Sequence, residues 1–528
     1  MKKRFIAFSL ALFSFGVMNF FYGQEASGAV NWYNGKAPGM NTEKAYSTLK
    51  KRTSSTVIVA VIDSGIDIEH EDLKGKIWTN KNEIPGNGID DDKNGYIDDI
   101  HGWNFLGSPE GNQAHARLEK TRIYAQLRER FQNTESANVA AADRADYDLY
   151  KKLETDINTE RQQYEAVIPQ YQMMQQSYPM IIGMIATQVG KENFTKADLD
   201  KWKPEGEQMQ QLKDFGYEVV AGRLNEEAIQ EGIDQLSSMV NYHLNPDYND
   251  RMMIGDNPHD FNDVRYGNND VEGPDALHGT HVGGIIGAVR GNGLGGDGVA
   301  TDILLMSVRA VPDGDEQDKD VALAIRYAVD NGAMVINMSF GKSYSMHQKE
   351  VQEAIAYADS KGVLLVHAAG NDNANVDVDD NFPTATYSFQ PAKPANYLTI
   401  GASTFTAKGS LPASFSNYGQ TKVDVFAPGL DIYSTVPQSE YKKLPGTSMA
   451  APMVAGTAAL LKSYFPSLTM LEIKDAILSS AKSYAGTQQT LPGAETTTDF
   501  AKLSVTGGVV DVNAAVKACM KIEAKKKG

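Results

Sequence analysis

The feature that most constrains the fold is an unbroken apolar run at residues 56–63, TVIVAVID, which Ser64 and Gly65 follow. β-Branched and aliphatic residues without polar alternation are typical of a strand buried on both faces, as in the middle of a parallel sheet. Asp63 then stands at the carboxyl end of this strand, where open α/β sheets place their functional groups. A single aspartate there can also cap a turn or a helix, so its role depends on the rest of the chain.

The second half of the chain alternates between short apolar runs and helical patterns. The expected strands are residues 303–308, 335–339 and 363–369, and the expected helices are residues 320–331 and 348–362. This alternation predicts an α/β fold with a doubly wound, mainly parallel sheet flanked by helices.

The N-terminus reads MKKRFIAFSLALFSFGVMNFFYG, in which three basic residues precede an apolar run. This order is typical of a secretory signal peptide over residues 1–23, with cleavage between Tyr22 and Ala26, and a membrane anchor is the alternative. No later segment looks membrane-spanning. We therefore expect an exported protein that is periplasmic, on the cell surface or extracellular, with no transmembrane segment in the mature chain.

The charge balance limits the partners of this chain. It has 50 Lys and Arg against 67 Asp and Glu, a net charge of −17, and loss of residues 1–23 removes three basic residues and makes it −20. So acidic a chain disfavours non-specific binding of nucleic acid or anionic lipid, and we expect no nucleic-acid partner. Cys519 is the only cysteine, so no intrachain disulfide can form. An exported protein of this kind depends on its core and often on bound metal for stability.

Changes of composition divide the chain into six segments. We expect a signal peptide (1–23), an N-terminal segment with one short helix (24–55), a first α/β part (56–111), a helical insertion (112–250), a second α/β part (251–520) and a basic tail (521–528).

The expected insertion is poor in Gly and rich in Gln, Glu, Lys and Met. Leu149, Leu153 and Ile157 recur on one face of a charged helix, and a separate helix is expected from Met180 to Val189, after Pro179. We expect four or five helices in an all-α arm with a structural or recognition role, and hypothesise that it restricts substrate access.

Residues 90–99, DDDKNGYIDD, have the spacing of a calcium loop. The oxygen ligands on offer are the side chains of Asp90, Asp92, Asn94, Asp98 and Asp99 and the carbonyl of Tyr96. Alternate residues of such a loop converge on one hard cation, as in the first half of an EF-hand loop. The alternative is an acidic solvated loop, but acids packed so closely repel one another without a cation. We expect structural calcium and no organic cofactor.

Residues 442–456, KKLPGTSMAAPMVAG, run from a small turn into the expected start of a buried helix. Ser448 would lie near a helix N-terminus, where backbone N–H groups are exposed and the macrodipole is positive. The oxyanion that a hydroxyl nucleophile generates needs such donors. An isolated serine there is usually a cap, so the chain must also supply a base, an orienting acid and a second donor.

Those groups are present elsewhere in the chain. His278 and His281 precede a small-residue helix, and Asn371 follows the strand expected at residues 363–369. The sequence does not support a zinc site at the two histidines, because it has neither an HExxH pattern nor a cysteine near them. Taken together, Asp63, His278 and Ser448 supply an acid, a base and a nucleophile in the order Asp…His…Ser. Asn371 supplies an amide donor for the oxyanion.

Four segments, VAVIDSGID, HGTHVGG, AAGN and GTSMAAPMVAG, resemble the Asp, His, oxyanion-Asn and Ser signatures of the subtilisin-like serine proteases, or subtilases. The resemblance covers roughly residues 56–107 and 265–515. It implies a serine endopeptidase acting on protein or peptide substrates through an acyl-enzyme, with Asp63, His278 and Ser448 as its triad and Asn371 in the oxyanion hole.

The resemblance also assigns binding residues. It implies that the substrate is held by Ser339 and Gly341 on one side and by Ala368, Ala369 and Gly370 on the other. Asp72 matches a calcium ligand of some members, and the glycine-rich loop near Asn292 would complete that site.

Two departures from the family pattern stand out. Asp63 and His278 are 215 residues apart because of the insertion, and no family-type pro-domain is expected before the first α/β part.

Two other classes of function stay open. One is a catalytically idle subtilase-like binding or scaffold protein that acts through its insertion, which a replaced triad residue would mark, and none is replaced. The other is a calcium-stabilised scaffold that processes itself once and then only binds.

Overall fold

The computed structural model describes residues 30–390 and 392–527, so the expected signal peptide lies outside the described residues. The chain divides into two compact units. Unit 1 comprises the residues up to 114, residues 251–312 and the residues from 316 onward, and unit 2 comprises residues 115–250 with residues 313–315.

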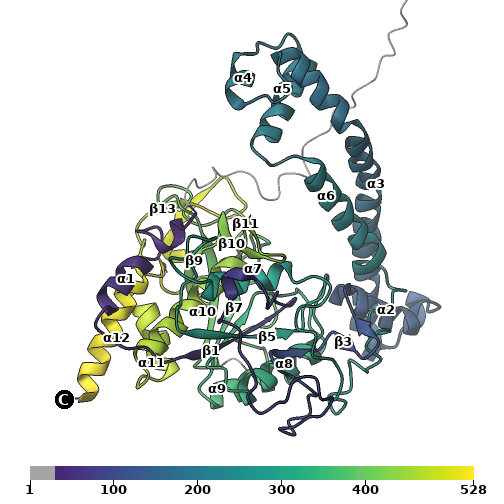
Figure 1. Ribbon diagram of the computed structural model, residues 1–528. Helices are drawn as coiled ribbons and strands as arrows, with labels where there is room; N and C mark the ends of the chain where they lie inside the picture. Colours follow the sequence, from purple (N-terminus) through teal and green to yellow (C-terminus); the bar gives the residue numbers. More distant parts are fainter. Residues whose placement is uncertain (1–29, 391, 528) are drawn as a thin grey trace, which may run out of the picture. The chain divides into compact units, whose positions relative to one another are not determined.

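Unit 1 is built on a nine-stranded sheet with the order β12-β15-β9-β8-β7-β6-β1-β5-β2 (Figure 1). Only β12 is antiparallel to its neighbour. The strands are β1 (Val57–Asp63), β2 (Gly102–Asn104), β5 (Ile303–Arg309), β6 (Val335–Met338), β7 (Leu364–Ala368), β8 (Tyr397–Ser403), β9 (Val425–Pro428), β12 (Lys482–Ser483) and β15 (Gly508–Val509).

The apolar run at residues 56–63 is indeed a central strand. β1 lies between β6 and β5, and Val59, Val61 and their neighbours are buried because helices cover both faces of the sheet. Helices α7 (Leu277–Gly287) and α10 (Thr447–Tyr464) pack on one face, and α8 (Asp318–Asp330) and α9 (Gln348–Ser360) on the other (Figure 1). The expected α/β fold is therefore confirmed.

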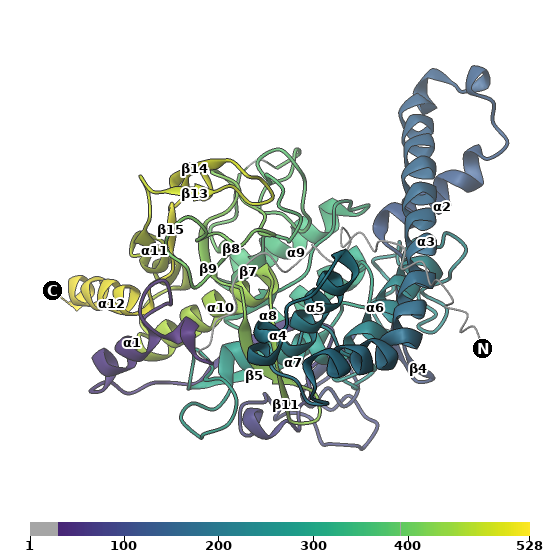
Figure 2. The ribbon, with the colours of Figure 1, turned by 90° about the horizontal axis from the view of Figure 1, so that it is seen from above.

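Smaller elements surround this sheet. They are α1 (Thr42–Leu49), α11 (Met470–Ser479), α12 (Val512–Lys527) and three two-stranded pairs, β3 (Gly107–Ser108) with β4 (Gly111–Asn112), β10 (Ile432–Val436) with β11 (Glu440–Leu444), and β13 (Gln488–Thr490) with β14 (Thr497–Asp499) (Figure 2). Helix α12 continues through Lys527, so it includes most of the residues expected as a basic tail. Ala, Glu and Lys favour helix there, and Glu523 pairs with Arg52 at 2.9 Å.

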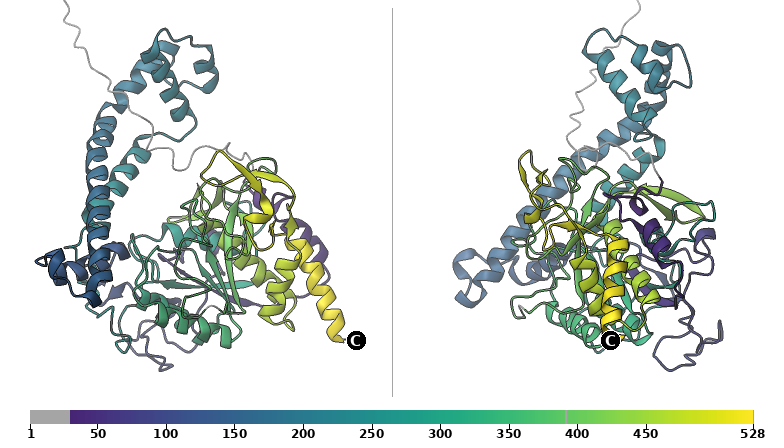
Figure 3. Two further views of the ribbon diagram at one scale, coloured as in Figure 1. Left: turned by 180° about the vertical axis from the view of Figure 1, so that it is seen from behind. Right: turned by 90° about the vertical axis from the view of Figure 1, so that its left-hand side faces the viewer.

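Unit 2 is all helical. Its helices are α2 (Glu119–Phe131), α3 (Arg144–Val189), α4 (Lys196–Lys201), α5 (Glu207–Val220) and α6 (Glu226–Ser238), which a π turn (Met239–His243) extends. The separate helix expected after Pro179 is wrong, because α3 runs unbroken for 46 residues through Pro169 and Pro179 (Figure 3). Both prolines are exposed, so water can satisfy the carbonyl groups that each ring deprives of a partner. Among the described residues, no helix has the length and apolar character needed to cross a membrane.

Candidate active site

Asp63 and His278 are joined by a hydrogen bond. Nδ1 of His278, in the first turn of α7, lies 2.6 Å from Oδ1 of Asp63, at the carboxyl end of β1. The helix comes this close because residue 279 is a glycine: a Cβ there would lie 2.1 Å from the carbonyl oxygen of Gly65. The structure thus brings together an acid and a base that are 215 residues apart in the chain.

The environment of His278 favours a charged ring. Burial alone disfavours the imidazolium, but the carboxylates of Asp63 and Asp275 outweigh burial and raise the pKa of His278 above its ordinary value. Asp63 is 1% exposed and His278 keeps 36% of its side chain exposed. The carboxylate can therefore hold the ring while its other edge remains accessible.

Ser448 lies in the first turn of α10, as expected. Its hydroxyl donates to the carbonyl oxygen of Ser339 at 3.1 Å, and the hydroxyl of Ser339 donates to the carbonyl of Ser448 at 2.9 Å. Ser448 Oγ is not hydrogen-bonded to His278 in the described part of the chain. Catalytic hydrogen bonds are often loose before substrate binds, and a χ1 rotation redirects a serine hydroxyl.

Two N–H donors converge beside Ser448. Asn371 follows β7, and its Oδ1 accepts hydrogen bonds from the backbone N–H and the hydroxyl of Thr447, both at 2.9 Å. Its Nδ2 therefore faces the other way. A Cβ on Gly446, which has a φ of +151°, would lie 3.5 Å from the backbone nitrogen of Ser448 and 3.7 Å from Nδ2 of Asn371. The two nitrogens therefore lie on the same side of the turn at Gly446.

The expected substrate-binding residues form two adjacent walls. Ser339 and Gly341 follow β6. Ala368 is the last residue of β7, and Ala369 and Gly370 follow it. Asn381 joins these walls, because it donates to the carbonyl of Ala369 at 2.9 Å and its Oδ1 lies 2.7 Å from where a Cβ on Gly341 would be. Asn381 lies in an irregular segment, so no local sequence pattern pointed to it.

The acidic loop at residues 90–99 gathers only some of its expected ligands. Asp90 and Asp92 cluster with Glu83, with one ligand atom from each within 4.8 Å of the others. Asp98 instead accepts the backbone N–H groups of residues 86–88, and Asp99 accepts the hydroxyl of Tyr327 at 2.6 Å. Burial raises the pKa of Asp99 to about 6.

Of the other two expected ligands of this loop, Asn94 contacts Asp92, and Tyr96 contacts Asn94 through its backbone nitrogen. The backbone nitrogen of Asn94 donates to Asp92 at 3.0 Å, and that of Tyr96 donates to Asn94 at 2.8 Å. Sequence reasoning missed Glu83, because it lies before the loop motif.

Asp72 is buried beside the glycine-rich loop. Asn292 donates to its Oδ1 at 2.6 Å, so the structure brings the two expected residues together. Oδ2 of Asp72 is buried without a partner among the described residues. Burial raises the pKa of Asp72, although Asn292 opposes this shift. A carboxylate oxygen in this state fits a cation ligand.

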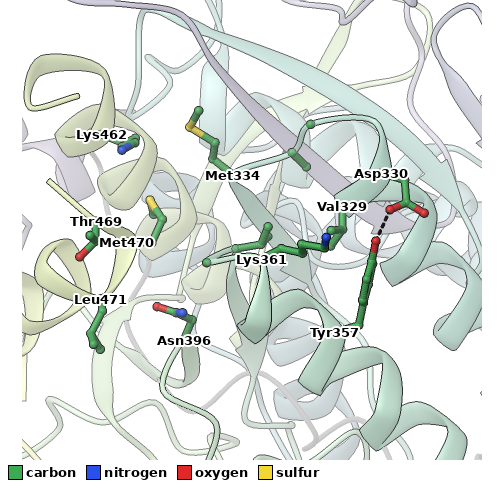
Figure 4. Close-up of a pocket in the computed structure, with 14 residues that line it drawn as sticks. Val329, Asp330, Met334, Tyr357, Lys361, Asn396, Lys462, Thr469, Met470 and Leu471 are labelled. Carbon is green, nitrogen blue, oxygen red and sulfur yellow. Dashed lines mark hydrogen bonds between the residues drawn. The ribbon is translucent and has the colours of Figure 1, made fainter. Parts of the chain in front are cut away.

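A separate hollow of about 640 Å³ (Figure 4) lies at the other end of the strands, away from Asp63 and Ser448. Met334, Val363 and Asn396 in its lining precede β6, β7 and β8, so the hollow is at the amino ends of these strands. Tyr357 donates to Asp330 at 2.5 Å within it. It contains none of the residues that the sequence singled out for chemistry.

Comparison with known proteins identifies the family of this chain. The model of the subtilase family matches residues 54–501. The chain is 37% identical over 277 residues to the thermophilic serine proteinase of Bacillus sp. (strain AK1), covering 52% of this chain and 61% of that protein. It is 39% identical over 211 residues to thermitase of Thermoactinomyces vulgaris, covering 40% and 69%. The chain thus spans less than two thirds of the Bacillus proteinase.

Among solved structures, proteases of Pseudoalteromonas arctica align with 32% identity and a TM-score of 0.37, over 49% of this chain and 74% of theirs.

Proposed function

Because this chain belongs to the subtilase family, we propose that it is an exported serine endopeptidase that hydrolyses peptide bonds through an acyl-enzyme. The observation that carries the proposal is the Asp63–His278 hydrogen bond of 2.6 Å. It lies at the carboxyl ends of the strands, as do the backbone nitrogen of Ser448 and Nδ2 of Asn371. These are the parts that acyl transfer requires, namely an oriented base, a hydroxyl and an oxyanion site.

In the proposed mechanism, the Ser448 hydroxyl leaves the Ser339 carbonyl and turns to His278. Nε2 of His278 takes the hydroxyl proton as Oγ attacks the scissile carbonyl, while Nδ1–H remains bonded to Asp63. The backbone N–H of Ser448 and Nδ2 of Asn371 stabilise the oxyanion. His278 then gives its proton to the leaving amine, and water repeats the sequence to release the acyl group.

The test is Ser448→Ala in the full chain, assayed on casein and on a peptide anilide. We expect kcat to fall by about 10⁴-fold or more with an unchanged melting temperature, because Ala suits a helix. Ser463→Ala is the matched control, since Ser463 is a buried serine of the same helix. Equal activity of the Ser448→Ala protein and the parent would contradict the proposal.

The alternative function, an idle or once-processed scaffold, predicts no turnover of casein by the parent protein itself. The full set of acid, base, hydroxyl and amide donor favours the enzyme, because a binding protein has no need to keep them.

Calcium is proposed as a structural cofactor at two places. At the first, Asp72 with its unpartnered Oδ2 would hold the ion beside the loop of Asn292. At the second, Glu83, Asp90 and Asp92 would hold it with Asn94 nearby. Bound there, calcium would neutralise clustered carboxylates and fix the loops that carry them.

A further inference from the structure

Arg309 is a buried cation beside the catalytic acid. It is the last residue of β5 and is 1% exposed. In the sheet it is in register with Asp63 of β1 on one side and with Asn104 of β2 on the other. Its side chain therefore starts next to Asp63, at the carboxyl ends of the strands, where the candidate active site lies.

The guanidinium group binds two segments of the chain through neutral acceptors. Nε donates to the carbonyl of Ser64 at 2.9 Å, and one terminal nitrogen donates to Oδ1 of Asn104 at 3.0 Å and to the carbonyl of Leu106 at 3.4 Å. The other donates to the carbonyl of Gln113 at 2.6 Å. These acceptors belong to the turn after Asp63 and to the segment 104–113, after which the chain enters unit 2.

Gly273 allows the chain to pass close to the guanidinium of Arg309. A Cβ on Gly273 would lie 2.3 Å from Nε of Arg309. No carboxylate lies within 4.0 Å of the guanidinium among the described residues, in contrast to the buried cation Lys319, which pairs with Asp256 at 2.8 Å. Burial lowers the pKa of Arg309 to about 10, which still leaves it charged at neutral pH.

A buried cation without a partner anion is costly. A neutral side chain could fill the same volume at lower cost, so a purely space-filling role does not account for an arginine here. What the arginine supplies is a rigid fork of donors that fixes several carbonyl groups at once.

The guanidinium of Arg309 affects the position of Asp63 through Ser64. The backbone N–H of Ser64 donates to Oδ1 of Asp63 at 2.8 Å, the same oxygen that binds His278. The other oxygen of Asp63 is buried without a partner in the described part of the chain. The direction of the carboxylate therefore depends on Ser64, and Ser64 is held through its carbonyl by Arg309.

We propose that Arg309 is a positioning residue that sets the orientation of the Asp63 carboxylate, and through it the His278 ring, by fixing the Ser64 turn to the 104–113 segment. This inference rests on the proposed protease function. It adds a contribution to catalysis from a residue that touches neither substrate nor the reacting atoms.

The test compares Arg309→Met and Arg309→Lys with Lys319→Met, the control for loss of a buried cation in the same unit. Each protein is titrated with a covalent serine reagent, and kcat is expressed per titrated site so that misfolded protein does not count. We expect Arg309→Met to lower kcat about tenfold or more with KM within twofold, and to shift the acid limb of kcat/KM. Arg309→Lys, which keeps a donor for Ser64, should recover part of the loss.

Lys319→Met should lower the melting temperature and leave kcat per site unchanged. The proposal would be overturned if Arg309→Met had the wild-type kcat per titrated site and an unshifted pH profile. Arg309 would then be a structural residue.

A second measurement separates this proposal from the protease function. The pKa of His278 is measured by NMR in Ser448→Ala with and without Arg309→Met, which requires no activity. A shifted His278 pKa supports the positioning role, and an unshifted one overturns it. Failure of the parent protein to hydrolyse casein would instead contradict the protease function.

Discussion

Asn371 and Thr447 are joined by two hydrogen bonds, because Oδ1 of the amide accepts both the backbone N–H and the hydroxyl of Thr447 at 2.9 Å. The hydroxyl of Thr447 also accepts the N–H of Gly370 at 3.1 Å. The loop after β7 is thus fixed to the first residue of α10. Since Oδ1 is occupied, the amide presents its nitrogen to the space beside Ser448, where we propose that the oxyanion binds, and Thr447 determines which end of Asn371 faces that space.

Replacing Thr447 with Val should weaken oxyanion binding. The change keeps the shape of this fully buried side chain and removes one of the two bonds to Asn371. We expect kcat to fall about tenfold with little change in KM, because the lost interaction matters mainly in the transition state. Thr457→Val is the matched control, since Thr457 is buried on the same helix and its hydroxyl bonds only within the helix, to Met453. Equal losses in both variants would contradict this role.

Replacing Gly446 with Ala should block the oxyanion site directly. The new methyl group would lie within 3.7 Å of both donor nitrogens, and the φ of +151° is strained for any residue with a Cβ. We expect kcat to fall about 100-fold or more. Gly362→Ala, at a φ of +72° with no atom within 4 Å, introduces strain alone. If that control lost activity to the same extent, strain and not obstruction would explain the effect.

The fold and the pairing of Asp63 with His278 could be predicted because they depend on local patterns. The apolar run that ends at Asp63 is typical of a strand in the middle of a sheet, and the turn before Ser448 is typical of the start of a helix. Glu83 and Arg309 could not be predicted, because their partners are distant in the chain: Arg309 binds Ser64 and Gln113 only once three strands are aligned. The helix boundary expected at Pro179 is wrong, because this proline is exposed and water can satisfy the carbonyl groups that its ring leaves without a partner.

The acid limb of the pH profile should respond to Asp275. Asp63 and Asp275 raise the pKa of His278, and the base must be neutral to accept a proton, so kcat/KM should rise with pH through that raised pKa. Asp275→Asn keeps the acceptor for the N–H of Leu277 and removes the charge. It should move the acid limb to lower pH by a few tenths of a unit, and less at 1 M salt because Asp275 is exposed. A shift to higher pH, or none at low salt, would refute the assignment.

Removal of calcium should lower the melting temperature of the Ser448→Ala protein, which cannot degrade itself. The two proposed sites are separated by Asp72→Asn and by Glu83→Gln with Asp92→Asn. Each variant should lose part of the difference in melting temperature between calcium and chelator, because a ligand that binds only the native state stabilises it. If the parent melts at the same temperature with and without chelator, neither place binds a structural ion.

Acid should destabilise the fold through two buried histidines. Burial lowers the pKa of His281 to about 3 and that of His367 to about 4, and hydrogen bonds to backbone carbonyls only partly oppose this. Between those values and the unfolded pKa of about 6.5, the unfolded chain binds more protons than the native one. The free energy of unfolding should therefore fall as pH drops below about 6.5, by up to about 1.4 kcal/mol per pH unit for each histidine.

His367→Gln tests this acid sensitivity, because an amide can still donate to the carbonyl of Phe340, which Nε2 of His367 contacts at 2.8 Å. Melting of the Ser448→Ala protein from pH 7.5 to 4.5, with and without this change, isolates the contribution of His367 from that of the carboxylates. The variant should lose less stability than its parent over this range. An identical pH dependence of the two proteins would show that His367 is not held neutral by burial.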